Sequence, residues 1–552
     1  MTTKPTLSDS PNDAHAPWAA RWGSTLFLVL AVTAARLLYI AFFSPYALIE
    51  DEAHYWEWSR HLDWSYYSKG PGIAWTIALT TILAGDTEFG VRLGAPLIGA
   101  VLALAVGQLA AEASGDARAR FFAAALVMLT PAFQVSSILL TIDGPYLACW
   151  ALASLAAWHA FKGGSRRAWA ALGAAISVGF LYKYTILLII PGLVIYAIAR
   201  RRTLAPRVCR ISNLLICLAV SLMGLVPVLI WNAQHDWDTV RHLLGHLGLE
   251  GGDMAAIPTR GNKPEQYSPM WTLEYLGALV MMLGVPVWLV FHSAIDPFLR
   301  PQRDQRVREG ALFCLAISAP IIIFYFLVSF MTEVEGNWPV AAYVTLIALG
   351  GWGAADGLAR ASTMLEAWRR LPTPRPRFGL VFARPHHPRQ RAFRAAVIFG
   401  VVIGLAMTRL DLATKLPIVG PRVKLGRLTA APELARNVAD LIQQLRDETG
   451  LEPFVIAEHY GRASLMAFYL PEQPTVYCAS SRTVGRRNQY DLWTQTDLDS
   501  PALIGLPAVF LRSHPDMFPG VFQSQTDLGS LPGDHKRNRH TFLGYGYLGF
   551  EQ

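Results

Sequence analysis

Charged residues are scarce in this chain. Only 16% of its 552 residues are Asp, Glu, Lys or Arg, whereas roughly 25% is usual in soluble proteins. Hydrophobic residues make up 53%, and the mean hydropathy is +0.31. This composition excludes an ordinary soluble globular protein and predicts an α-helical polytopic membrane protein.

Cysteines are few, and cofactor motifs are missing. The five cysteines have no metal-ligand spacing, and four of them lie in or beside apolar runs, which predicts packing roles: Cys149, Cys209, Cys217, Cys314 and Cys478. The chain has no glycine-rich phosphate loop of the Rossmann or Walker type. We therefore expect no required cofactor. A divalent cation beside Asp51 and Asp143 would suit their carboxylates but has no support from ligand spacing.

The excess of basic residues has a membrane explanation. The net charge is +8, but the arginines fall in short loops between apolar runs, which is the pattern of cytoplasmic membrane flanks. The pattern excludes a nucleic-acid partner and predicts contact with membrane lipids.

Apolar runs divide most of the chain. Eleven of them approach the ~20 residues needed to cross a bilayer, and they lie near residues 23–43, 89–111, 120–140, 144–161, 168–182, 184–200, 211–231, 271–293, 310–331, 338–358 and 395–410. The fifth and sixth are short and meet at Lys183, which leaves the total open by one or two. The run at 72–84 is too short for a span and is predicted to be interfacial or re-entrant.

The arginines also predict the orientation. They occupy alternate loops, which must then be cytoplasmic, and the intervening loops carry mainly Asp and Glu. Residues 1–22 are accordingly predicted to be a disordered cytoplasmic tail. Residues 23–410 are predicted to form the membrane domain, with a first outer loop at 44–88, and residues 411–552 an extracytoplasmic domain.

The first outer loop carries the densest polar motif. Residues 50–60 combine four carboxylates with three aromatic rings directly after a membrane-length run, and Lys69 follows. Charges near hydrocarbon are costly, so they are usually kept there for a pathway or for chemistry. Solvation of an ordinary loop also explains an isolated Asp-Glu pair. What favours function is that further polar motifs fall on the same predicted face.

Those further motifs lie at residues 141–145, 182–184, 231–237 and 333–339. Each has a simpler alternative: Asp143 as a helix N-cap, Lys183 as a snorkelling lysine, and the tryptophans as an interfacial belt. Together they suit a ligand that is part lipid, part phosphate and part sugar, because cations bind phosphate and a carboxylate can accept a hydroxyl proton.

The ordered set of motifs resembles the GT-C membrane glycosyltransferases. It is most similar to bacterial members of glycosyltransferase family 39, the dolichyl-phosphate-mannose protein mannosyltransferase type, and to the lipid A aminoarabinose transferases. The resemblance runs through residues 51–71, 85–93, 141–145, 183–184, 231–237, 335–339 and 485–493. Two positions depart from the relatives: Gly70 follows Lys69 where they usually have Pro, and Gly336 stands where Pro is common.

The resemblance implies an inverting glycosyltransferase at the outer face of a bacterial inner (plasma) membrane. The implied donor is a polyprenyl-phosphate-linked sugar, and the acceptor hydroxyl belongs to a lipid, glycan or protein. Asp51 is the implied general base, and Lys69 is the implied ligand of the donor phosphate. The full expected set is Asp51, Glu52 and Asp143 for catalysis, Lys69, Arg92 and Lys183 for the donor phosphate, and Tyr55, Arg60, Tyr182, His235, Asp236, Glu335, Asn337 and Trp338 for substrate.

The tail is predicted to be a small α/β domain. Helical periodicity at 431–449 and 461–470 alternates with strand-like runs at 452–457 and 475–478. A surface role explains its polar clusters at 458–460 and 486–487, although a domain over the cavity would help to select the acceptor. The proline-rich segment 369–394 is predicted to be a basic cytoplasmic linker.

The main rival function is a transporter or flippase of a lipid-linked saccharide, which would bind the same molecule without chemistry. Transporters often show internal repeats and midplane charges. This chain shows neither, because its charges gather at one predicted face. A weaker rival is a non-catalytic assembly protein whose outer domain binds a partner.

Overall fold

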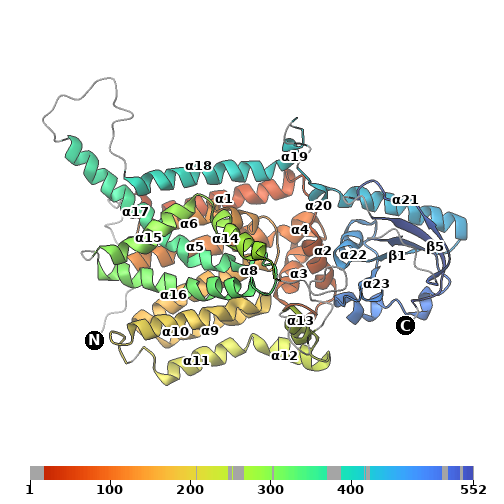
Figure 1. The fold of residues 1–552 in the computed structure, drawn as a ribbon, viewed down its shortest axis with the longest axis horizontal. Coiled ribbons are helices and arrows are strands. Elements are labelled where there is room, and N and C mark those ends of the chain that lie inside the picture. The colour runs from red at the N-terminus through yellow and green to blue at the C-terminus, as the bar shows by residue number, and fades with distance from the viewer. Residues whose placement is uncertain are drawn as a thin grey trace.

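The computed structural model describes residues 18–206, 208–246, 252, 267–300, 304–369, 387–415, 417, 420, 423–512, 520–534 and 539–550. Helices run side by side through one half of the molecule, and a small sheet with its helices forms the other half (Figure 1). The expected helical class and the small C-terminal sheet are both observed. The expected tail is described only from residue 18, and most of the linker at 369–394 lies outside the described residues.

The helical half is built from long, largely apolar elements. They are η2 (Trp18–Ala20), α1 (Trp22–Phe42), α5 (Gly94–Ser114), α6 (Ala119–Leu129), α7 (Pro131–Val135), α8 (Asp143–Gly163), α9 (Arg166–Tyr182), η3 (Tyr184–Leu188), α10 (Ile189–Arg200), α11 (Ile211–Leu222), α12 (Leu225–Gln234), α13 (Asp238–His246), α14 (Pro269–Leu283), α15 (Pro286–Leu299), α16 (Gln305–Val328), η5 (Trp338–Ala341), α17 (Ala342–Arg369) and α18 (Pro388–Thr408). Small residues allow close packing. A Cβ added at Gly310 of α16 would lie 2.4 Å from the carbonyl oxygen of Ala113 on α5.

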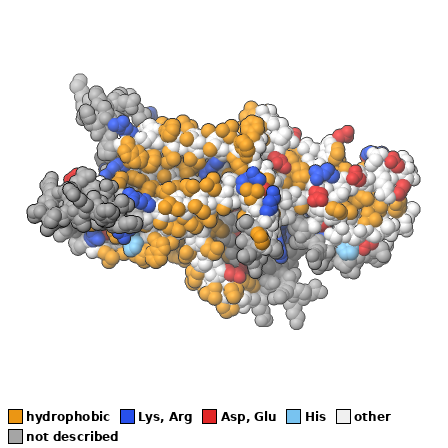
Figure 2. Space-filling model, turned by 90° about the horizontal axis from the view of Figure 1, so that it is seen from above, with side chains coloured by type: hydrophobic (Ala, Val, Ile, Leu, Met, Phe, Trp, Pro, Cys, Tyr) orange, Lys and Arg blue, Asp and Glu red, His pale blue; other side chains and the backbone are white. Residues whose placement is uncertain are grey.

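The predicted total of eleven spans is not confirmed. Within the described ranges, five helices are long and apolar enough to cross a membrane, or seven if each of two bent pairs counts as one span. The pair α11–α12 bends by 45° and the pair α14–α15 by 96°. The run at 120–140 is also divided, because α6 ends at Leu129 and Pro131 begins α7. Hydrophobic side chains cover most of the helical half in Figure 2, as a lipid-facing surface requires.

Three short helices lie between the two halves (Figure 1): α2 (Glu50–Arg60), α3 (Gly72–Ala84) and α4 (Glu88–Arg92). The carboxylates of Glu50, Asp51 and Glu52 occupy the first turn of α2, and Arg60 occupies its last turn. This arrangement complements the helix dipole. The polar motif is therefore a helix, and α3 is the separate short helix expected from the run at 72–84.

The C-terminal half contains a five-stranded sheet in the order β2-β1-β3-β5-β4. Its strands are β1 (Phe454–Ala457), β2 (Val476–Cys478), β3 (Ala508–Leu511), β4 (Phe522–Asp527) and β5 (Thr541–Tyr547), and its helical elements are α19 (Leu410–Ala413), α20 (Gly426–Thr429), α21 (Ala431–Thr449), α22 (Tyr460–Tyr469), α23 (Ser480–Thr483), η7 (Gln489–Leu492), η8 (Thr494–Thr496) and η9 (Pro501–Leu503). β1 is parallel to β2 and β3, whereas β5 is antiparallel to β3 and β4. The sequence predicted α21, β1, α22 and β2 but not the last three strands.

The C-terminal half packs directly on α2. One buried apolar cluster includes Trp56 and Trp58 of α2 together with Met466 and Phe468 of α22. Polar contacts reinforce it, since the amide N of Leu48 donates to the Tyr469 hydroxyl at 2.7 Å. The helix that carries Asp51 is therefore held between the membrane helices and the C-terminal domain.

Candidate functional site

A cavity of about 520 Å³ opens where α2, α7, α8, α14 and η5 meet. Eight of the fourteen expected site residues line it: Asp51, Tyr55, Lys69, Asp143, Lys183, Glu335, Asn337 and Trp338. The rest of the lining is mostly apolar: Ile49, Pro131, Ala132, Val135, Leu139, Ile142, Leu147, Met281, Met282, Val340 and Met407, with Ser136 and Thr141. Charged groups and a large apolar surface therefore share one cavity.

Asp51 lies in the first turn of α2 with its side chain open to the cavity. Burial in the surrounding protein raises the pKa of its carboxyl above the usual range for aspartate. The positive charge of Lys69 opposes this rise in the pKa, whereas the negative charge of Glu335 adds to it. A carboxylate that is poorly solvated in this way is a better base than an exposed one.

Lys69 lies in the turn between α2 and α3. The Tyr66 amide and the Ser65 hydroxyl both donate to its carbonyl oxygen, at 3.0 and 3.1 Å. Its ammonium reaches the cavity, where no carboxylate of the described part of the chain forms an ion pair with it. Burial and the charge of Lys183 lower its pKa. This cation is therefore available to bind an anionic ligand.

Asp143 connects three elements of the cavity wall. It lies in the first turn of α8, where the Lys183 ammonium donates to its Oδ1 at 2.8 Å and the Asn337 amide donates to its Oδ2 at 2.8 Å. Both carboxylate oxygens of Asp143 are thus occupied, and Lys183 is already paired. The sequence placed these residues on one face without indicating that they bind one another.

Glu52 and Arg92 are brought together, but away from the cavity. Arg92 donates from Nε to Glu52 Oε1 at 2.9 Å and from Nη2 to Oε2 at 2.6 Å, and both side chains are almost fully buried. Arg92 also donates to the carbonyl oxygens of Tyr46 and Ala47. This ion pair connects α2 to α4. The geometry therefore does not favour the catalytic role expected for Glu52 or the phosphate-binding role expected for Arg92.

Arg92→Ala is expected to destabilise the folded protein by about 3–5 kcal/mol, because it leaves the Glu52 carboxylate buried without its partner. Thermal unfolding of the purified protein measures this loss. The matched control is Arg446→Ala, since Arg446 and its partner Glu452, 2.5 Å apart, are both exposed, and a surface pair contributes little to stability. Equal loss in both variants would contradict the structural role of Arg92.

Four other expected substrate residues lie elsewhere in the described structure. Arg60 donates to Glu57 and to the carbonyl oxygen of Gln473. Tyr182 shares a hydrogen bond with Thr76 of α3. His235 stacks on the Trp231 ring with centroids 4.1 Å apart. Asp236, in the turn that follows, has a left-handed backbone with φ of 49°. None of these four side chains lines the cavity.

The residues that the sequence missed are apolar. Met281 and Met282 come from α14, Met407 from α18, and Pro131 and Val135 from α7. Each belongs to a hydrophobic run, where nothing in the sequence separates a ligand contact from a lipid contact. Across the described ranges, no three His, Cys, Asp or Glu side chains gather to hold a metal ion.

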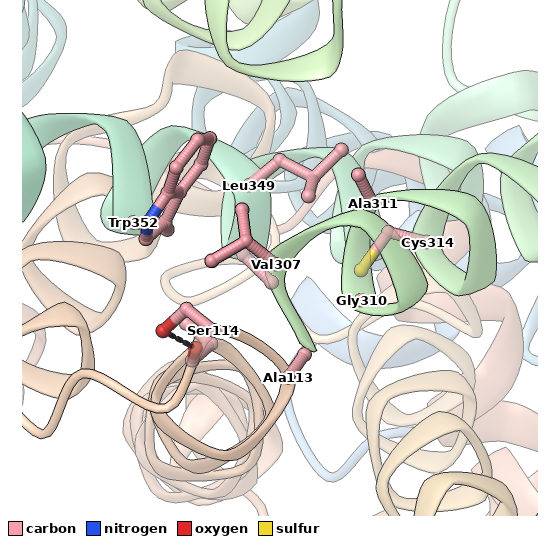
Figure 3. A pocket seen from close by; sticks show the side chains of 10 residues that line it. Ala113, Ser114, Val307, Gly310, Ala311, Cys314, Leu349 and Trp352 are labelled. Atoms are coloured by element: carbon pink, nitrogen blue, oxygen red, sulfur yellow. Dashed lines mark hydrogen bonds between the residues drawn. The ribbon is translucent and has the colours of Figure 1, made fainter. Parts of the chain in front are cut away.

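A second cavity between α5, α16 and α17 is different in kind. Val307, Leu349 and Trp352 face one another across it (Figure 3). It holds only about 10 Å³ and is lined almost entirely by apolar side chains. This is a packing gap too small for more than one water molecule, and it is not a candidate site.

Comparisons with known proteins identify relatives of this chain. Residues 68–231 match the family described as dolichyl-phosphate-mannose-protein mannosyltransferase. The chain is 30% identical over 332 residues to the lipid A galacturonosyltransferase RgtD of Rhizobium johnstonii, which covers 60% of this chain and 65% of the relative, just under two thirds of its length. It is 26% identical over 397 residues to an undecaprenyl phosphate-α-4-amino-4-deoxy-L-arabinose arabinosyl transferase of Pseudomonas aeruginosa, which covers 61% of this chain and 72% of the relative.

The fold has a solved counterpart. The crystal structure of ArnT from Cupriavidus metallidurans bound to undecaprenyl phosphate aligns with a TM-score of 0.62 and 18% identity, covering 96% of this chain and all of that one. The helical half and the C-terminal sheet thus recur together in one known fold. The resemblance read from the motifs is confirmed: residues 68–231 match the dolichyl-phosphate-mannose-protein mannosyltransferase family, and the chain shares the fold of that ArnT structure.

Proposed function

We propose that this protein transfers a sugar from a polyprenyl-phosphate carrier to an acceptor hydroxyl at the outer face of the bacterial inner membrane, with inversion at the anomeric carbon. The observation that carries the proposal is the cavity itself. It places the Lys69 ammonium, which has no carboxylate partner among the described residues, the Asp51 carboxylate and a large apolar wall around one space. A lipid-linked phosphosugar needs all three.

The donor fits the cavity by its chemistry. Its phosphate is assigned to Lys69, because ammonium groups bind phosphate through charge-assisted hydrogen bonds. Its prenyl chain is assigned to the apolar wall formed by Val135, Met281, Met282 and Met407, where removal from water is favourable. The relatives named above include transferases of undecaprenyl phosphate-linked sugars, which supports the same donor class here.

The reaction is a single displacement. Asp51 accepts the proton of the acceptor hydroxyl as that oxygen forms a bond to the anomeric carbon. The bond between the anomeric carbon and the phosphate oxygen breaks, and the departing polyprenyl phosphate keeps the electron pair, stabilised by Lys69. Because the nucleophile enters opposite the leaving group, the configuration inverts.

Asp143, Lys183 and Asn337 act as positioning residues in this proposal. Their mutual hydrogen bonds join α8, the turn before η3 and the segment before η5, so they hold together a part of the cavity wall. Glu335, Trp338 and Tyr55 complete the polar part of the cavity and are assigned to the sugar. Lipid A is the acceptor named for the rhizobial relative, and a glycolipid of that type is the acceptor we propose.

The experiment that tests this function uses the full-length protein in nanodiscs with undecaprenyl-phosphate-linked 4-amino-4-deoxy-L-arabinose or galacturonic acid as donor and lipid A as acceptor. Mass spectrometry is expected to show a glycosylated acceptor and free undecaprenyl phosphate in equal amounts. A transporter or flippase would instead move the labelled donor between leaflets of a liposome and leave both lipids chemically unchanged, and that result would reject the transferase.

Transfer is expected to weaken as the pH falls through the pKa of Asp51, because only the ionised carboxylate accepts a proton. That pKa lies above the usual aspartate range, and the negative charge of Glu335 raises it. Glu335→Gln should therefore move the acidic limb of the kcat/KM profile to lower pH, whatever it does to the maximum rate. A limb that stays in place or moves to higher pH in this variant would contradict Asp51 as the titrating base.

A further inference from the structure

A group of buried charges lies where the C-terminal sheet meets the start of α2. Arg462 is in the first turn of α22, and Asp534 and Arg539 lie in the segment between β4 and β5. Each of the three side chains is at most 8% exposed, and both arginines form ion pairs with Asp534. None of them lines the candidate site, so the proposed reaction does not use them directly.

A carboxylate of α2 joins this group. The Arg539 Nη2 atom lies 4.0 Å from the Glu50 Oε1 atom, and Glu50 is the first residue of α2. The backbone of α22 also comes close to this residue, since a Cβ added at Gly461 would lie 2.6 Å from the Glu50 Cβ. The C-terminal domain therefore brings a guanidinium group to the end of α2 that carries the proposed base.

The group keeps its positive charge at neutral pH. Burial lowers the pKa of Arg462 to about 10, although the charge of Asp534 opposes this change. At pH 7 the guanidinium is therefore still protonated. The Nε atoms of Arg462 and Arg539 are buried without a hydrogen-bond acceptor among the described residues. Asp534 thus does not use all the donors of the two arginines, and Glu50 meets a positively charged surface.

Glu50 is the neighbour of Asp51 on α2. Both carboxylates lie in the first turn of the helix. The negative charge of Glu50 adds to the rise that burial produces in the pKa of the Asp51 carboxyl, because a like charge disfavours ionisation. A cation that pairs with Glu50 reduces this effect and so favours the ionised form of Asp51.

The other charged or titratable groups that face Asp51 belong to the cavity or stay neutral. They are Lys69, Asp143, Lys183, Glu335, Tyr55 and Tyr460. The two tyrosines stay neutral because burial raises their pKa values above the usual tyrosine range. The other four line the cavity, so changing one of them alters the substrate space as well as the charge. Arg539 lies outside that lining.

We propose that Arg539 of the C-terminal domain is a positioning residue for catalysis: it neutralises Glu50 and thereby keeps the adjacent Asp51 carboxylate able to accept a proton. The inference rests on the proposed transferase function and gives the C-terminal domain a part in the reaction. Arg539 acts through Glu50 and does not line the cavity. Asp534, which also binds Arg462, holds the Arg539 guanidinium at the start of α2.

The test is the pH dependence of kcat/KM for sugar transfer by the full-length protein in nanodiscs. Arg539→Gln should move the acidic limb to higher pH by about 0.5–1 unit, because the uncompensated charge of Glu50 makes Asp51 harder to ionise. Glu50→Gln should move the limb to lower pH. Adding Arg539→Gln to Glu50→Gln should move it little further, and Arg539→Lys should restore most of the wild-type profile.

These shifts separate an electrostatic role from a structural one. Loss of folded protein lowers the rate at every pH and leaves the limb in place. Arg482→Gln is the matched control, because it removes an equal charge from the same domain at a residue paired with Asp499, and it should leave the limb unchanged. A limb that stays in place in Arg539→Gln, or that moves equally with and without Glu50, would overturn the inference and leave the transferase intact.

An infrared titration reads the same shift without turnover. The band of the protonated Asp51 carboxyl is identified by its loss in Asp51→Asn, and its midpoint should rise in Arg539→Gln and fall in Glu50→Gln. A midpoint that is the same in wild-type protein and Arg539→Gln would reject the role of Arg539. Failure of the transferase is a separate result, namely the absence of glycosylated product from every polyprenyl-phosphate donor.

Discussion

Asp51→Asn is expected to lose at least about 100-fold in kcat, because general-base catalysis is typically worth 10² to 10⁴ in rate. The amide keeps the size and hydrogen-bonding capacity of the carboxylate but cannot accept a proton. Donor affinity should change little, since the phosphate is assigned to Lys69. The measurement is steady-state transfer in nanodiscs at matched protein concentration, with donor binding measured separately.

Glu52→Gln is the control for the Asp51→Asn experiment. Glu52 adjoins Asp51 in the sequence, but its carboxylate is buried against Arg92 and also accepts hydrogen bonds from the amides of Ile49 and Leu140. We expect Glu52→Gln to lose less turnover per folded molecule than Asp51→Asn, and to lose stability instead. Normal transfer by Asp51→Asn would remove Asp51 from the mechanism, and full activity in both variants would favour the transporter.

Lys69→Ala is expected to weaken donor binding by about 10- to 100-fold, the range for losing a hydrogen bond between charged groups. The reason is that Lys69 is the cation of the cavity without a carboxylate partner in the described structure. Binding of undecaprenyl phosphate, measured by isothermal titration, gives the affinity directly. Lys69→Arg should keep part of it, since the charge is preserved.

Lys183→Ala separates a phosphate ligand from a positioning residue. Lys183 donates to Asp143 at 2.8 Å, so its removal leaves the Asp143 carboxylate without its main partner. We expect a lower melting temperature and a lower kcat, with a smaller change in donor affinity than in Lys69→Ala. If Lys69→Ala binds undecaprenyl phosphate normally while Lys183→Ala does not, the phosphate assignment belongs to Lys183.

Asp51 and Glu52 show how much of the site could be predicted from the sequence. Asp51 and Glu52 are chemically equivalent in the printed sequence, and both were expected to act in catalysis. In the structure they occupy successive positions of α2, which point about 100° apart around a helix axis. One faces the cavity and the other faces Arg92. The phase of the helix against its neighbours, which composition does not report, determines which of the two side chains lines the cavity.

The apolar residues of the cavity wall could not be predicted from the sequence. Met281, Met282 and Met407 line the cavity, yet each lies in a run whose hydrophobicity is explained by the membrane alone. The first two lie at the end of α14, just before the bend of 96° to α15. A window of mean hydropathy counts that region as one span, because it records how apolar a segment is and not where it turns.

The sequence by itself determined the α-helical membrane class, the family resemblance, the polar motif at residues 50–60 and the first half of the C-terminal α/β unit. Each of these depends on local composition, on periodicity or on a contiguous motif, which can be recognised without knowing the packing. The tertiary structure decided which charges are paired and which remain free. Asp143 meets Lys183 and Asn337, Glu52 meets Arg92, and Lys69 meets no carboxylate among the described residues. The physical reason is that an ion pair depends on distances between segments far apart in the chain, and only the packed fold fixes those distances.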